Sequence, residues 1–252
     1  MYNPLQLREI FHLEFLRWFG RKVKKNYALK GGVNLRFFFK SFRYSEDMDL
    51  DIWQIEVAVL KEIIMKILQS PLFNDGLKSF GIEKVVAPDI LKAKQTETTQ
   101  RFKIHLITSS GEDLFTKIEF SRRGFDEGIV VEPVLDAILR IYKLPPLVVA
   151  HYNIQSTIQQ KLNAIAYRKI VQARDIFDLY ILSSQYNPTK RVQITINGEK
   201  KRKICENIYG VNFEEFRDTV LAYLSEEDQS VYNSSGLWDE VKLKVINFIE
   251  EL

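Results

Sequence analysis

Residues 29–51 read LKGGVNLRFFFKSFRYSEDMDLD, and this stretch decides what fold we expect for the chain. Near its end Asp47, Asp49 and Asp51 alternate with apolar residues, which is the period of a strand with one polar and one apolar face. Neighbouring carboxylates on such a face lie roughly 6.5 Å apart along the strand. Two carboxylates at that spacing can share a pair of divalent cations, and oxygen ligands favour Mg²⁺ or Mn²⁺. The pattern therefore predicts a metal site on this strand.

Two glycines, Gly31 and Gly32, precede the acidic strand. Because glycine has no Cβ, its backbone N–H groups can approach a phosphate closely, and its φ angle is unrestricted. The apolar residues that follow predict a helix packed on a sheet, with Arg36 facing outward. A phosphate at the start of that helix would meet its partial positive charge. The glycine pair alone also fits an ordinary turn, and the acidic strand alone also fits a polar strand face. The combination of the two predicts a nucleotide site.

The spacing is Gly-Gly, twelve residues, then Ser-x-Asp-x-Asp, with Arg43 two residues before Ser45. This spacing resembles the DNA polymerase β-like nucleotidyltransferase superfamily, and residues 29–35 and 43–51 look more closely like the AbiEii/AbiGii-type toxin family. The threonine usual after the family's glycines is Val33 here. The resemblance implies that Asp47 and Asp49 hold Mg²⁺ or Mn²⁺. It also implies a set of residues that bind the phosphates of a nucleoside triphosphate (NTP): Gly31, Gly32, Arg43 and Ser45.

A hairpin is predicted downstream, from alternating residues at 101–107 and 114–121 with a turn at 109–113. Glu119 lies in its second strand between Ile118 and Phe120. The polymerase β-like pattern places a third acidic residue on such a strand, so the resemblance implies that Glu119 is a catalytic residue and metal ligand beside Asp47 and Asp49. A solvent-exposed Lys117–Glu119 pair explains the same alternation.

A second charged group lies in a helical region. If one helix runs from residue 158 to 183, Lys161, Arg168 and Asp175 share one of its faces. Such a face also fits a surface helix with salt bridges of about 0–1 kcal/mol each. The family's later motifs contain a lysine, an arginine and an Arg-Asp-x-x-Asp-Leu segment, here residues 174–179. The resemblance, which covers residues 27–183, implies that Lys161 is catalytic and contacts nucleotide phosphates, and that Asp175 completes the catalytic site.

The overall prediction is an α+β protein. A nucleotidyltransferase domain over residues 1–131 has a mixed sheet and an N-terminal helix over 4–25, and a mainly helical domain follows over 132–252. Further helices are expected over 56–70, 212–224 and 237–252, with a short extended piece over 147–152. Residues 73–92 are ambiguous. Residues 192–198 predict a small hairpin, because Asn197-Gly198 favours a type I′ turn.

Composition excludes several classes of protein. One cysteine cannot form an intrachain disulfide, and its spacing from the three histidines predicts no zinc site. No signal peptide or membrane span is expected, which favours the cytoplasm. A net charge of +3 does not by itself indicate nucleic-acid binding. The basic runs at residues 21–25 and 200–203 fit either a solvated face or RNA-backbone binding.

The resemblance also implies a function. It implies a bacterial toxin of the phage abortive infection type, which transfers a nucleotide from an NTP to an acceptor hydroxyl and releases pyrophosphate. The implied acceptor is the tRNA 3′ end, and the implied protein partner is a cognate antitoxin. The residues alone leave open an acceptor on a protein or a small molecule, and also a catalytically silent binding module. The three carboxylates Asp47, Asp49 and Glu119 favour an enzyme.

Overall fold

The computed structural model describes residues 2–89, 95–124, 127–187 and 194–252. Internal contacts divide the chain into two compact units. The first unit comprises Met1–Phe38 and Tyr44–Tyr152, and the second comprises Phe39–Arg43 and Asn153–Leu252. Residues 132–152 group with the first unit, because the strands on either side of residue 140 pair within the sheet, and the long segment of the second unit begins at Asn153.

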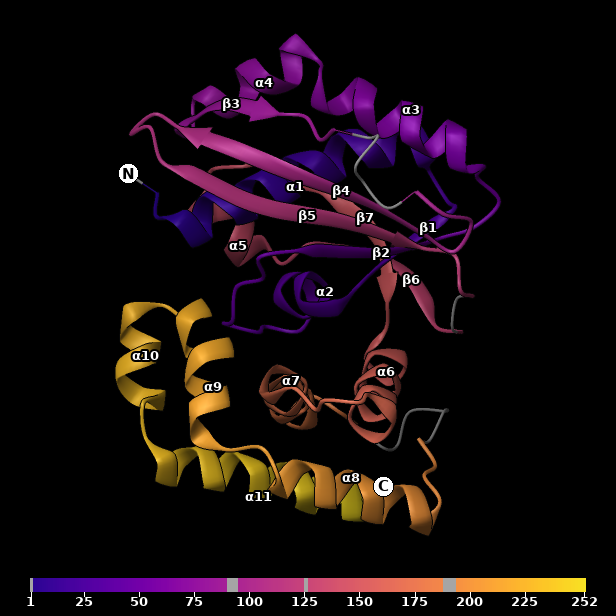
Figure 1. The fold of residues 1–252 in the computed structure, drawn as a ribbon, viewed down its shortest axis with the longest axis vertical. Coiled ribbons are helices and arrows are strands. Elements are labelled where there is room, and N and C mark those ends of the chain that lie inside the picture. The colour runs from indigo at the N-terminus through magenta and orange to yellow at the C-terminus, as the bar shows by residue number, and fades with distance from the viewer. Residues whose placement is uncertain (1, 90–94, 125–126, 188–193) are drawn as a thin grey trace. The chain divides into compact units, whose positions relative to one another are not determined.

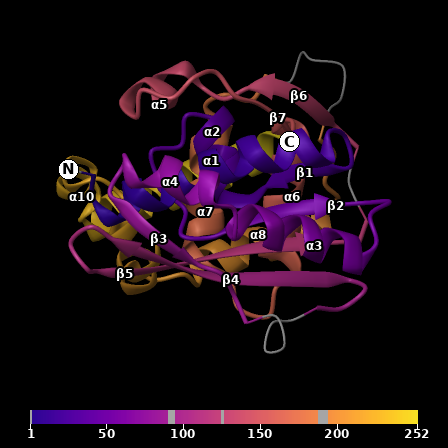
Figure 2. The same ribbon diagram turned by 90° about the horizontal axis from the view of Figure 1, so that it is seen from above.

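The first unit is built on a mixed sheet, as predicted. Within the described residues the sheet has seven strands in the order β3-β4-β5-β2-β1-β7-β6, and Figure 2 shows β4 and β5 on the opposite side from β6. Strand β1 is antiparallel to β2 and parallel to β7, while β2 is parallel to β5. The strands are β1 (Tyr27–Lys30), β2 (Met48–Ile52), β3 (Ile82–Val86), β4 (Thr99–Thr108), β5 (Asp113–Ser121), β6 (Ile129–Pro133) and β7 (Val148–Tyr152). The hairpin β4–β5 and the extended piece β7 confirm the sequence prediction.

Helices pack on this sheet through apolar faces. They are α1 (Pro4–Val23), α2 (Gly31–Phe38), α3 (Val57–Leu68), α4 (Pro71–Lys78) and α5 (Asp136–Ile141). Helix α1 begins with a capping box between Asn3 and Gln6, and it buries Phe11, Phe15 and Phe19 completely. The expectation that Arg36 faces outward is wrong. Its side chain is largely shielded from water, and its guanidinium pairs there with Glu9 of α1 at 2.6 Å.

The second unit is helical. Its helices are α6 (Ile154–Tyr167), α7 (Ala173–Ser183), α8 (Gly198–Tyr209), α9 (Phe213–Thr219), the 3₁₀ turn η1 (Leu221–Tyr223), α10 (Glu226–Tyr232) and α11 (Ser235–Glu251). Helices α8 and α11 lie side by side (Figure 1). The aromatic rings of Phe216 and Trp238 stack at 4.4 Å between centroids, with Phe177 next to Phe216. None of the described helices in either unit is long and apolar enough to span a membrane.

Two predictions for this unit are wrong. The single helix expected over 158–183 is two helices, because Arg168 takes an extended conformation and ends α6. The hairpin expected at 192–198 does not form over its described part. Asn197 caps α8 instead, accepting a hydrogen bond from the backbone N–H of Lys200 at 2.8 Å, and residues 192–193 lie outside the described chain. Asparagine favours both turns and helix N-caps, and here the cap is formed.

Candidate active site

The predicted catalytic carboxylates meet on neighbouring strands of the first unit. In the parallel pair of β2 and β5, Asp49 lies directly opposite Glu119. On the other side of β2, the antiparallel partner of Asp49 is Lys30, at the end of β1. The apolar residues of β2, Met48 and Leu50, are completely buried on the opposite face. The two-residue period of the strand therefore places carboxylates beside a cation and over a buried apolar face. We call Asp47, Asp49, Asp51 and Glu119 the acidic row.

Each carboxylate of this row except Asp49 is held by a cation. Lys117 contacts Asp47 at 2.7 Å, and Arg101 contacts Glu119 at 2.6 Å. Asp51 pairs with Lys30 and also accepts a hydrogen bond from the Tyr152 hydroxyl at 2.7 Å. Among the described residues, Asp49 has no ion-pair partner within contact distance.

The surroundings of Asp49 disfavour its negative charge. Burial raises the pKa of the Asp49 carboxyl, the charge of Glu119 raises it further, and Lys30 and Lys117 only partly oppose these effects. A bound divalent cation would remove this penalty, and an all-oxygen donor set of Asp47, Asp49 and Glu119 suits Mg²⁺ or Mn²⁺. Within the described chain, no three His, Cys, Asp or Glu side chains are preassembled as a metal cluster. Binding would thus draw Asp47 from Lys117 and Glu119 from Arg101.

Gly31 lies against the Asp49 carboxylate. Its φ of +69° is in the left-handed region, and a Cβ at this position would lie 3.0 Å from Oδ2 of Asp49. A side chain there would be strained and would crowd the carboxylate, so the close approach requires glycine. Helix α2 starts at this residue, and Gly32 lies in its first turn. The partial positive charge of the helix N-terminus is consequently placed beside the acidic row.

A chain of hydrogen bonds supports the backbone just before Asp47. The Thr116 hydroxyl donates to the Glu46 carbonyl at 2.7 Å, so its oxygen accepts from Nε2–H of His12 at 2.8 Å. Burial, together with the charge of Arg8, lowers the pKa of His12 to about 3, so the ring is neutral. The Ser45 hydroxyl donates to the Asp47 carbonyl at 2.8 Å. The sequence analysis did not predict a role for His12, whose only signal is that it is a polar residue on the apolar face of a helix.

The remaining predicted residues gather in the second unit. Lys161 of α6 contacts Asp175 at 2.9 Å and Asp178 at 2.5 Å, both on α7, and Arg43 contacts Asp178 at 3.0 Å. Arg168 also pairs with Asp175. Burial opposes the charge of Lys161, but the two carboxylates outweigh it and raise its pKa. Burial likewise works against the charge of Asp178, yet Arg43 and Lys161 lower its pKa. Asp178 therefore links the two buried cations of this cluster, Lys161 and Arg43.

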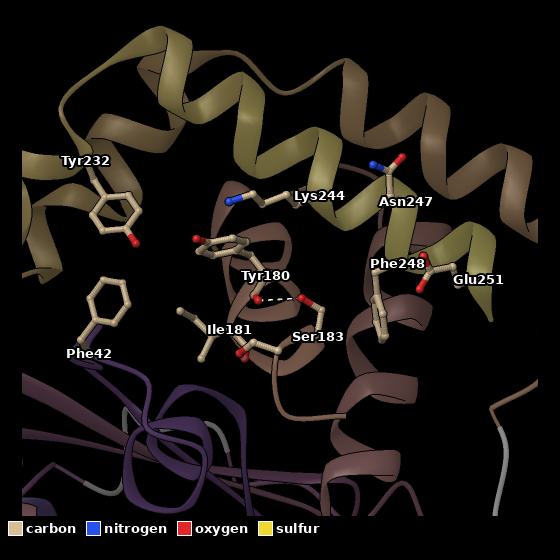
Figure 3. Close-up of a pocket in the computed structure, with 10 residues that line it drawn as sticks. Phe42, Tyr180, Ile181, Ser183, Tyr232, Lys244, Asn247, Phe248 and Glu251 are labelled. Carbon is tan, nitrogen blue, oxygen red and sulfur yellow. Dashed lines mark hydrogen bonds between the residues drawn. The ribbon is translucent and has the colours of Figure 1, made fainter. Parts of the chain in front are cut away.

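A pocket of about 520 Å³ opens elsewhere in the second unit (Figure 3). Aromatic side chains form much of its wall, namely Phe42, Tyr180, Tyr232 and Phe248. The ammonium group of Lys244 lies 5.7 Å from the centre of the Tyr180 ring. The described lining includes none of the predicted site residues, although Phe42 precedes Arg43 in the chain.

Comparison with known proteins assigns the chain to a family. The family model described as "Nucleotidyl transferase AbiEii toxin, Type IV TA system" matches residues 20–230. The chain belongs to this family. As an AbiEii protein it is a nucleotidyltransferase toxin of a type IV toxin–antitoxin system, which confirms the enzyme class and the fold class predicted from the sequence.

Solved structures share this fold at low sequence identity. A putative nucleotidyltransferase from Helicobacter pylori matches with a TM-score of 0.59 and 17% identity, over 99% of this chain and 95% of that one. JHP933, also from H. pylori, gives 0.56 and 17%, over 99% and 92%. MenT4, a nucleotidyltransferase toxin from Mycobacterium tuberculosis, gives 0.58 and 17%, over 99% and 85%. No curated protein sequence matches the chain.

Proposed function

We propose that this AbiEii protein transfers a nucleotide from an NTP to the 3′ end of tRNA, with Mg²⁺ or Mn²⁺ held by Asp47, Asp49 and Glu119. The observation that carries the proposal is the placement of Asp49, which faces Glu119 across β2 and β5 without an ion-pair partner in the described chain. A divalent cation, when bound, supplies charge neutralisation for the triphosphate and lowers the pKa of the attacking hydroxyl.

The residues of the first unit bind and orient the nucleotide in this proposal. Backbone N–H groups at Gly31 and Gly32 donate to phosphate oxygens at the start of α2, where the helix dipole favours negative charge. The acceptor oxygen attacks the α-phosphorus, the bond from that phosphorus to the bridging oxygen breaks, and pyrophosphate leaves. Ser45 shapes the turn before Asp47 through its hydrogen bond and is also proposed to contact phosphate.

The charged cluster of the second unit supplies further groups. Arg43 and Lys161 are proposed phosphate contacts, because each is cationic at neutral pH and is held in place by carboxylates. Asp175 is proposed to complete the catalytic set by fixing Lys161. Both assignments follow the family motifs, and the support from the structure is that these residues lie in one hydrogen-bonded group.

The biological role is a further part of the proposal. Membership of a type IV toxin–antitoxin family supports a cognate antitoxin as a partner. A role in phage defence is part of the proposal. We place the reaction in the cytoplasm, where NTPs and tRNA are found. A protein or small-molecule acceptor remains the second candidate, since the carboxylate site serves any hydroxyl.

One experiment separates these acceptors. The protein is incubated with Mg²⁺, total RNA and each α-labelled NTP in turn, beside the Asp49→Asn variant and a reaction with EDTA. We expect label in the tRNA band from the wild type only. Label that appears in protein would reassign the acceptor. Label that appears nowhere with any NTP, or that persists in Asp49→Asn, would contradict the proposed site.

A further inference from the structure

Two lysines of α8 lie over the ring of Tyr167, which is the last residue of α6. The ammonium nitrogens of Lys200 and Lys203 are 5.6 and 5.2 Å from the ring centre. The Lys200 nitrogen also donates to Oδ1 of Asn163 at 2.7 Å, so α6 fixes its position. Tyr167 nevertheless remains 67% exposed. We call these four residues the Tyr167 clasp.

The positive charge of the clasp is not neutralised. In the described chain neither Lys200 nor Lys203 forms an ion pair, and partial burial lowers the pKa of Lys200. Three lysines of other helices differ, because each pairs with a carboxylate on its own helix: Lys66 with Glu62, Lys78 with Asp75 and Lys242 with Asp239. The clasp therefore concentrates cationic charge that only a bound anion would offset.

Residues close to the clasp in the sequence add further cationic and apolar surface. Lys169 and Arg202 are exposed, and Ile170 exposes 68% of its surface. An exposed ring, an exposed aliphatic side chain and unpaired cations are the groups that bind single-stranded nucleic acid, since bases stack on the ring and phosphates contact the lysines. A duplex hides its bases and would use only the cations, and an acidic peptide has no need of the ring.

We propose that the Tyr167 clasp binds single-stranded RNA, with a base stacked on Tyr167 and the adjacent phosphates held by Lys200 and Lys203. The clasp lies wholly in the second unit and contains none of the residues assigned above to phosphate or metal. The inference rests on the proposed function only in identifying this RNA with the acceptor.

Fluorescence anisotropy of a labelled 12-nucleotide single-stranded RNA tests the proposal on the full chain. Tyr167→Ala is expected to weaken binding about tenfold, because loss of one stacked base costs roughly one factor of ten or more. Tyr167→Trp should retain binding. The pair Lys200→Gln with Lys203→Gln should weaken binding and reduce the slope of log affinity against log salt by about 1.4, at about 0.7 per phosphate contact.

The matched control is Tyr209→Ala. Tyr209 is also an exposed tyrosine, at 63%, and ends the same helix that carries the two lysines, but no described lysine lies over its ring. The Tyr209→Ala variant should bind RNA as the wild type does. Equal losses in Tyr167→Ala and Tyr209→Ala, wild-type binding in Tyr167→Ala, or no RNA binding by the wild-type protein would each overturn the proposal. So would equal affinity for polyglutamate, which lacks bases.

Failure of the catalytic proposal gives a different result. Asp49→Asn should bind the RNA normally while losing transfer, since Asp49 belongs to the other unit. If the wild type transfers no nucleotide but binds RNA through Tyr167, the clasp stands and the proposed function fails. If Tyr167→Ala binds and labels RNA as the wild type does, the clasp alone fails.

Discussion

The two charged groups of this protein are built on opposite principles. In the first unit, the acidic row along β2 and β5 leaves Asp49 without a cationic partner in the described chain, and burial raises its pKa. In the second unit, Lys161, Asp175, Asp178 and Arg43 form a buried network in which each charge contacts an opposite one. In the proposed function the first arrangement binds a cation, whereas in the second the carboxylates and cations hold one another in position.

Breaking the second network should give the largest change. Lys161→Ala leaves Asp175 and Asp178 buried with only part of their compensation, and loss of one partner of a buried ion pair costs about 3 kcal/mol or more of unfolding free energy. Urea denaturation measures this change. Lys66→Ala is the control, because its exposed pair with Glu62 is worth at most about 1 kcal/mol. Equal stability of the two variants would show that the Lys161 network does not hold the unit together.

A smaller effect is expected in the first unit at Gly31. Gly31→Ala places a Cβ 3.0 Å from Oδ2 of Asp49 in a left-handed backbone, a conformation that costs about 1–3 kcal/mol. The variant should lower both thermal stability and nucleotide transfer, because the new Cβ pushes on the Asp49 carboxylate. Gly76→Ala in α4 meets nothing within 4 Å and should be neutral or slightly stabilising. Wild-type activity in Gly31→Ala would contradict the conclusion that the close approach of residue 31 to Asp49 requires glycine.

The free energy of unfolding should also change gradually with pH, because of His12. The pKa of His12 in the folded chain, about 3, lies below the ordinary value of 6.5. Between these two pH values the unfolded chain binds a proton at His12 and the folded chain does not. Stability from this group is complete above pH 6.5 and falls as the pH drops toward 3, by about 1.4 kcal/mol per pH unit. His12→Asn can still donate to Thr116 but does not titrate. Its stability should fall less steeply with acid, and equal slopes would contradict a buried neutral histidine.

The sequence predicted the local parts of the site well. The alternation of Asp47–Asp51, the Gly31-Gly32 start of a helix and the β4–β5 hairpin are short-range patterns, and all three form. The register that sets Asp49 opposite Glu119 is a contact between distant segments, which periodicity does not contain. Only the family resemblance pointed to it.

The second unit was harder to predict because helical spacing continues across a break. Residues 158–183 keep apolar residues at helical intervals, yet Arg168 ends one helix and Ala173 starts another. Lys161 and Asp175 still meet, by packing of two helices rather than by sharing one face. The catalytic and nucleotide-binding roles of these residues remain predictions, as does the division of the chain at residue 132.

Binding of a divalent cation by Asp49 and its neighbours can be measured by titration with Mn²⁺, followed by electron paramagnetic resonance. Three proteins are compared: wild type, Asp49→Asn, and Asp51→Asn on the same strand, where Asp51 is already paired with Lys30 and Tyr152. We expect that the wild type and Asp51→Asn bind Mn²⁺ and that Asp49→Asn does not, because a neutral amide is a poor ligand for a hard cation. Equal Mn²⁺ binding by Asp49→Asn and wild type, or no binding by the wild type with NTP present, would contradict this expectation.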